Sequence, residues 1–79
     1  MYRIPVKSSN LASVGYDEQA MKLEIEFLDR SIYEYIGVQK YVYSELMQAD
    51  SKGKYFSKNI RDNRLYSCTQ TYPRYRMLR

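Results

Sequence analysis

The chain has 79 residues and a formal net charge of +4, and it contains ten tyrosines, one cysteine and no histidine. At this length it forms one domain with a small core, so most of its apolar residues are needed for packing. The lack of histidine excludes a Ser-His-Asp triad and a Cys-His pair, and the single cysteine excludes the usual zinc sites, so no metal or other cofactor is expected.

The start of the chain carries no signal-like apolar run, and no segment approaches the ~20 apolar residues that span a bilayer. Because Cys68 is the only cysteine, no intramolecular disulfide can form, which is typical of proteins in a reducing compartment. We therefore expect a cytoplasmic protein that is neither secreted nor anchored to a membrane.

Two strands are predicted in the first part of the chain. The polar cluster at residues 8–10 is typical of a turn, and residues 11–16 follow it as a short strand. Residues 17–20 form a connecting loop. Residues 22–27 then alternate polar and apolar side chains, which predicts a half-buried strand. Its apolar face consists of Leu23, Ile25 and Phe27.

A third strand is predicted at residues 32–36, after a tight connection at residues 29 and 30. It places Tyr33 and Tyr35 on the same strand face. A two-residue connection leaves these tyrosines on the polar face, exposed enough to stack on unpaired bases. A three-residue connection places them in the core, with each hydroxyl seeking a partner at the rim. The needs of a small core favour the second alternative, but the sequence leaves both open.

A helix is predicted from residue 38, where the apolar spacing changes to that of an amphipathic helix. Its apolar sector consists of Val38, Val42, Leu46 and Ala49, widened by Tyr43 and Met47. Such a helix can cover one face of the sheet in a two-layer α+β arrangement.

A second, shorter helix is predicted after Ser51, which suits the N-cap position. Gly53 in its first turn weakens it by up to ~1 kcal/mol relative to alanine. We therefore expect this helix to be brief and to depend on Phe56 and Ile60 for docking on the sheet.

Positive charge is concentrated around this second helix. Residues 51–79 hold eight basic residues and one acidic residue, a net of +7, whereas residues 1–50 hold five basic and eight acidic residues, a net of −3. Three of the cations fall in one narrow sector at about 100° per residue, namely Lys54, Lys58 and Arg61. Tyr55 lies at the edge of this sector, where its ring could stack on a base beside the cations. The same charge also suits a solvated face that keeps a small protein soluble.

Other patterns favour structural explanations. The Ser-Lys-Gly-Lys run at residues 51–54 lacks the second glycine and the preceding parallel strand of a Walker-type loop. Glu24 and Glu26 share a strand face, but a solvent-facing polar edge is strongly favoured over a catalytic carboxylate pair. Cys68 is interpreted as an incidental thiol, since no histidine can activate it.

Beyond Asn63 the chain shows no periodicity. We expect residues 1–63 to form the α+β domain and residues 64–79 to form a basic, extended or flexible C-terminal tail.

Five short motifs span most of the chain, from about Pro5 to Asp62. They are Ser8-Ser9-Asn10-Leu11, Val14-Gly15-Tyr16-Asp17, Leu23-Glu24-Ile25-Glu26-Phe27, Tyr33-Glu34-Tyr35 with Gly37-Val38, and Ser51-Lys52-Gly53-Lys54-Tyr55-Phe56 followed by Ile60-Arg61. Together they resemble the KTSC domain, which occurs at the C-terminus of some lysyl-tRNA synthetases and as small free-standing bacterial and phage proteins. The central Tyr-x-Tyr is the hallmark of that family.

The resemblance implies a small domain without enzymatic activity, and the synthetase context suggests RNA binding. The chain departs from the family pattern at Asp29-Arg30, where the family commonly has glycine, and at Gln39, where a proline often opens the helix.

The sequence thus predicts an α+β fold in which a three-stranded antiparallel β-meander packs against one longer and one short C-terminal α-helix. We expect a non-catalytic module that binds RNA, either tRNA or a single strand, and no membrane. The alternative is a domain that docks on a larger cytoplasmic protein. The residues expected to contact nucleic acid are Lys52, Lys54, Tyr55, Lys58, Arg61 and Arg64, while Tyr33 and Tyr35 are either stacking or structural.

Overall fold

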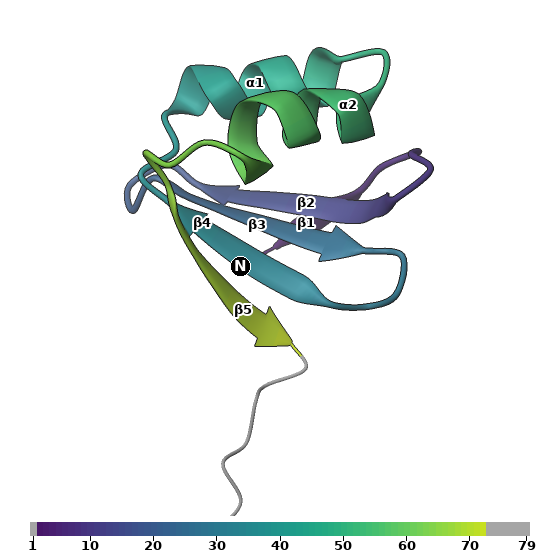
Figure 1. Cartoon of the computed structure of the whole chain (residues 1–79), viewed down its shortest axis with the longest axis horizontal. Helices are drawn as coiled ribbons and strands as arrows, with labels where there is room; N and C mark the ends of the chain where they lie inside the picture. Colours follow the sequence, from purple (N-terminus) through teal and green to yellow (C-terminus); the bar gives the residue numbers. More distant parts are fainter. Residues whose placement is uncertain (1, 73–79) are drawn as a thin grey trace, which may run out of the picture.

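In the computed structural model, which describes residues 2–72, helices cover one face of a five-stranded antiparallel sheet (Figure 1). The strands lie side by side in chain order: β1 (Arg3–Pro5), β2 (Leu11–Asp17), β3 (Lys22–Phe27), β4 (Ile32–Ile36) and β5 (Ser67–Tyr72). The helices α1 (Lys40–Gln48) and α2 (Lys52–Phe56) pack beside each other, and α2 continues directly into the π-helical turn η1 (Ser57–Arg61). Within residues 2–72 no helix is long and apolar enough to cross a membrane.

The predicted α+β class is confirmed, but the prediction of three strands is wrong. The sheet has two further strands, β1 and β5, one at each edge. β5 falls inside the segment expected to be an extended or flexible tail, and it pairs with β4 so that Cys68 lies opposite Tyr35. The sheet therefore extends beyond residue 63 to Tyr72, whereas residues 73–79 lie outside the described part of the chain.

The hairpin between β3 and β4 has the longer of the two connections considered above. Phe27 donates its backbone N–H to the Ser31 carbonyl at 2.9 Å, so three residues lie between the paired positions. Arg30 closes the turn with a left-handed backbone, at φ 77°. This geometry is that of a type I turn followed by a left-handed residue, a common three-residue hairpin loop.

This register places both tyrosines of β4 on the core face, because Tyr33 pairs with Ile25 and Tyr35 pairs with Leu23. Tyr35 is only 4% exposed, and Tyr33 is half-buried against the core. The core alternative for the Tyr-x-Tyr motif is therefore the one found.

The core joins the covered face of the sheet to the two helices and η1. Its buried side chains are Leu11, Val14, Leu23, Ile25 and Tyr35 from the strands, and Val38, Val42, Leu46, Phe56 and Ile60 from the segments above them. Phe56 is its centre, since its ring packs edge-on against Phe27 and Tyr35 at centroid distances of 5.6 and 5.5 Å. The predicted docking residues of the second helix, Phe56 and Ile60, are thus buried. Of the apolar sector predicted for the first helix, Val42 and Leu46 are buried on α1. Val38 is buried just before the helix begins, whereas Ala49 follows its end and is only partly buried.

The opposite face of the sheet, which is not covered by any helix of residues 2–72, carries a charged network. Arg3 of β1 donates to Glu24 Oε1 at 3.0 Å and to Ser13 Oγ at 3.0 Å. Ser13 in turn donates to Glu26 at 2.6 Å. The prediction that Glu24 faces solvent is wrong, because the added strand β1 brings Arg3 over it and leaves it 9% exposed.

Candidate nucleic-acid interface

Residues 52–61, which we call the basic segment, include Lys52, Lys54, Lys58 and Arg61. This segment begins with a short helix that starts where the sequence predicted it. Ser51 is the N-cap of α2, and its hydroxyl accepts a hydrogen bond from the Lys54 N–H at 3.3 Å. Phe56 and Ile60 are fully buried on the side facing the sheet. With that side fixed in the core, Lys54 and Lys58 project from the exposed side.

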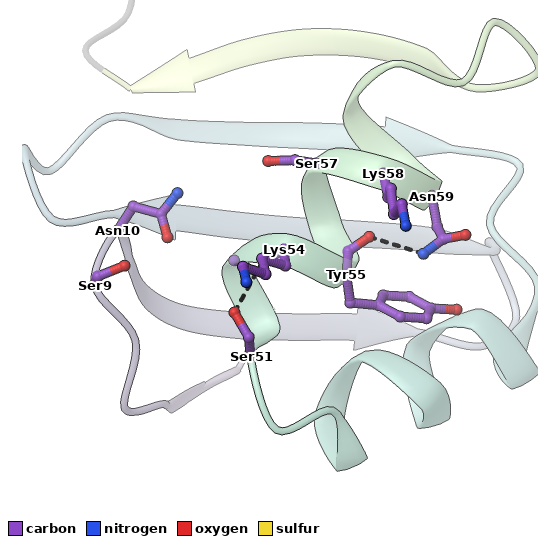
Figure 2. Close-up of a pocket in the computed structure, with 9 residues that line it drawn as sticks. Ser9, Asn10, Ser51, Lys54, Tyr55, Ser57, Lys58 and Asn59 are labelled. Atoms are coloured by element: carbon purple, nitrogen blue, oxygen red, sulfur yellow. Dashed lines mark hydrogen bonds between the residues drawn. The ribbon is translucent and has the colours of Figure 1, made fainter.

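Lys54 and Lys58 line one surface hollow of about 600 Å³, which we call the lysine hollow (Figure 2). It lies between α2 with η1 on one side and the loop before β2 on the other, and that loop contributes Ser9 and Asn10. The remaining lining residues are Ser51, Gly53, Tyr55, Ser57 and Asn59. Within residues 2–72 no carboxylate forms an ion pair with either lysine. The hollow therefore combines two free ammonium groups with hydroxyl and amide donors, a set that suits phosphate oxygens.

Arg61 lies apart from the two lysines, in contrast to the single sector expected from helical spacing. The backbone from Ser57 to Arg61 forms a π-turn, whose hydrogen bonds run from i to i+5. A wider turn rotates the chain less per residue than an α-helix does, so the sector calculated for an α-helix does not reach residue 61. Arg61 lines a different pocket, and its guanidinium Nε lies 3.5 Å from the carboxylate of Asp62.

Three other candidate residues differ in how free they are. Lys52 is partly buried, and its ammonium group donates a hydrogen bond to the Ala49 carbonyl at 3.1 Å, just beyond the end of α1. Tyr55 lines the hollow but extends its ring toward α1, where its hydroxyl donates to Glu45 at 2.6 Å, so the ring is fixed to the first helix (Figure 2). Arg64 is exposed in the segment between η1 and β5.

A second pocket, of about 380 Å³, lies between the core face of β4 and β5 and the end of η1. We call it the tyrosine pocket; it is lined by Phe27, Ser31, Tyr33, Tyr35, Arg61 and Cys68. Burial raises the pKa of the Tyr35 phenol, and contact with the Cys68 thiol adds to this shift. The Tyr35 phenol, which is neutral at physiological pH even at its ordinary pKa, is therefore still harder to ionise.

Sequence reasoning missed two contributions to these surfaces. Ser9 and Asn10 lie more than 40 residues from Lys54 in the chain, so no local spacing connects them. Cys68 reaches the tyrosine pocket only because β5 joins the sheet, and the uncharged run of β5 has no apolar alternation that predicts a strand.

The comparison with known proteins agrees with this fold. A model of the KTSC domain family matches residues 7–66, which is most of the chain. The chain belongs to the KTSC domain family. An uncharacterized protein of Stutzerimonas stutzeri is 40% identical over 58 residues, which is 73% of this chain and 82% of that protein. The crystal structure of a KTSC domain protein from Yersinia pestis is similar with a TM-score of 0.82 and 36% identity, covering 87% of this chain and 94% of that one.

Proposed function

We propose that this KTSC domain is a non-catalytic, cytoplasmic module that binds RNA, with Lys54 and Lys58 contacting backbone phosphates in the lysine hollow. The observation that carries the proposal is that both lysines line one hollow and neither has a carboxylate partner within residues 2–72. Lysines that are not neutralised by the protein are available to replace the counterions of a phosphate backbone.

Two further exposed cations follow the lysines along the chain. Arg61 lines the other pocket and Arg64 lies beyond η1, so a single strand has to continue past the lysine hollow to meet all four positive side chains. The contact of Arg61 with Asp62 is a surface ion pair, 55% and 70% exposed, and such pairs contribute little. Lys52 is less available because it is held at the end of α1.

Salt dependence is the direct test. Four phosphate contacts with a single strand predict that log affinity falls with log salt concentration at a slope of about −3. Fluorescence anisotropy with tRNA and with short single-stranded RNA, measured from low to moderate salt, gives this slope. Absence of binding at low salt, or binding that salt does not weaken, refutes the proposal.

Paired lysine substitutions locate the contacts. Lys58→Gln should weaken binding and reduce the magnitude of the slope by about 0.7, since one phosphate contact is lost. Lys40→Gln is the matched control, because it removes the same charge from an exposed lysine that already pairs with Glu18 at 3.4 Å. Equal effects of the two substitutions would show that only net charge matters.

A second function, docking on a larger protein, is favoured by the exposed edge of β5. This six-residue strand carries no charged residue or proline, the features that usually protect a sheet edge, and all but one of its residues are exposed. An extended segment of a partner could add to it as a further strand. Thr69→Lys should abolish recovery of a defined partner from nuclease-treated extract and leave RNA affinity undiminished.

A further inference from the structure

The tyrosine pocket differs in chemistry from the lysine hollow. The rings of Phe27 and Tyr33 pack edge to face beside it, with centroids 5.6 Å apart, and Tyr33 is only half-buried. Tyr35 is nearly inaccessible, so of the two tyrosines Tyr33 has the more exposed ring. The pocket therefore presents aromatic surface, which the lysine hollow largely lacks.

Polar groups are present around this aromatic surface. Ser31 and Cys68 contribute a hydroxyl and a thiol, and Arg61 contributes the only cation among the lining residues. The positive charge of Arg61 opposes the rise in the pKa of Tyr35, as expected for a guanidinium that lies near the phenol. Its exposed contact with Asp62 is weak enough for an anion to displace.

An aromatic surface beside a cation and hydrogen-bonding groups matches one nucleotide of an unpaired strand. Bases stack on aromatic rings irrespective of sequence, while a cation holds the phosphate. The pocket's volume of about 380 Å³ is in the range of small-ligand sites. Lys58 and Arg61 belong to the same turn, so one strand can reach the lysine hollow and the tyrosine pocket together.

We propose that the tyrosine pocket takes one unpaired base of a single-stranded RNA, with Arg61 on the phosphate of that nucleotide. This inference rests on the proposed RNA binding and assigns its base-contacting site. It makes the domain selective for unpaired strands, because a base inside a duplex cannot enter the pocket.

Cys68 provides the reporter for the test. It is the only cysteine of the chain, it is exposed, and it lines the pocket, so its rate of alkylation by iodoacetamide reports whether the pocket is filled. The rate is measured on the full chain with a single-stranded RNA octamer and with an octamer of abasic nucleotides. Anisotropy follows binding of both in parallel. At ten times its dissociation constant the RNA should slow alkylation about tenfold, and the abasic strand should bind without slowing it.

The possible results separate the two proposals. If both strands bind but protect Cys68 equally, or neither protects it, the base site is refuted and the proposed RNA binding stands. If neither strand binds at low salt, the RNA-binding function itself fails. If a tyrosine-containing peptide protects Cys68 and the RNA does not, the pocket belongs to a protein partner and the inference is overturned.

Substitution of the exposed cysteine gives a second, independent arm. Cys68→Leu fills the pocket from its edge without removing a core side chain, and should lower the affinity for the RNA octamer to that for the abasic strand. Thr69→Leu is the matched control, because it adds bulk at the neighbouring exposed residue, which pairs with Glu34 on the other face of β5 and does not line the pocket, and it should leave both affinities unchanged. If Cys68→Leu still binds the RNA octamer more tightly than the abasic octamer, by the same factor as the wild type, the proposal is contradicted.

Discussion

The hydroxyl of Tyr55 donates a 2.6 Å hydrogen bond to Glu45 Oε1 and thereby connects α2 to α1. Burial raises the pKa of the Tyr55 phenol, and the hydrogen bond to Glu45 raises it further, so the folded state favours the neutral donor. The basic segment is thus fixed to the first helix by a contact that depends on the protonation of one phenol.

Tyr55→Phe should lower the free energy of unfolding by about 1 kcal/mol at neutral pH, the usual contribution of one hydrogen bond. Because the folded-state pKa lies above the ordinary value of 10.0, this contribution is complete below pH 10 and is lost as the pH rises above it. Urea denaturation from pH 7 to 11 should show the wild type and the variant converging at high pH. Tyr41→Phe, at a residue 62% exposed, is the control and should change little.

The left-handed backbone of Arg30 predicts a stabilising substitution. A residue with a Cβ at φ 77° is strained by roughly 1–2 kcal/mol, whereas glycine adopts this conformation freely but loses more entropy on folding. Arg30→Gly should therefore raise the free energy of unfolding by about 0.5–1 kcal/mol in thermal or urea denaturation. Arg30→Ala removes the charge and keeps the strain, so a gain of the same size in that variant would assign the effect to charge.

The network on the uncovered face of the sheet predicts a large loss from a single substitution. Arg3→Met leaves the nearly buried carboxylate of Glu24 without its partner, and an unsatisfied group of this kind costs about 1–3 kcal/mol. Lys40→Met breaks the exposed pair with Glu18 and should change stability by less than about 0.5 kcal/mol. Similar losses in the two variants would contradict the role assigned to burial.

Because Gly53 lies close to Asn10, substitutions at these two positions should have coupled effects on the free energy of unfolding. A Cβ at position 53 would collide with the Asn10 side-chain carbonyl, which also accepts a hydrogen bond from Ser8. Gly53→Ala alone should therefore give less than the ~1 kcal/mol that alanine normally adds to a helix. In an Asn10→Ala background the full gain should appear. A double-mutant cycle by urea denaturation measures this coupling, and strict additivity would show that Asn10 moves aside without cost.

The parts of the fold that local patterns specify were predictable. The alternation of residues 22–27 gave a strand with the observed bounds, and Ser51 was correctly identified as an N-cap. The features that depend on distant parts of the chain were not. β5 has no apolar alternation and forms only because β4 offers it backbone partners, and the hairpin register depends on Arg30 accepting a strained conformation.

The candidate site shows the same division. Helical spacing correctly predicts that Lys54 and Lys58 lie on the same exposed side, because Phe56 anchors the opposite side of α2 in the core. The position of Arg61 could not be predicted in this way, since the π-turn that redirects it is a backbone irregularity with no simple residue signature. Tyr33 and Tyr35 could be assigned to the core only once the hairpin length was known.

Strand alternation sends Glu24, Glu26 and Glu34 to the face opposite the helices, while Lys54 and Lys58 project from the helical side. Within residues 2–72 these five side chains therefore set up an electric dipole across the thickness of the domain, which Arg3 and Lys22 offset only in part. In the field of a polyanion this dipole exerts a torque that turns the lysine side forward before any contact forms. A domain of this size can in this way align itself during diffusion, so that more of its encounters are productive.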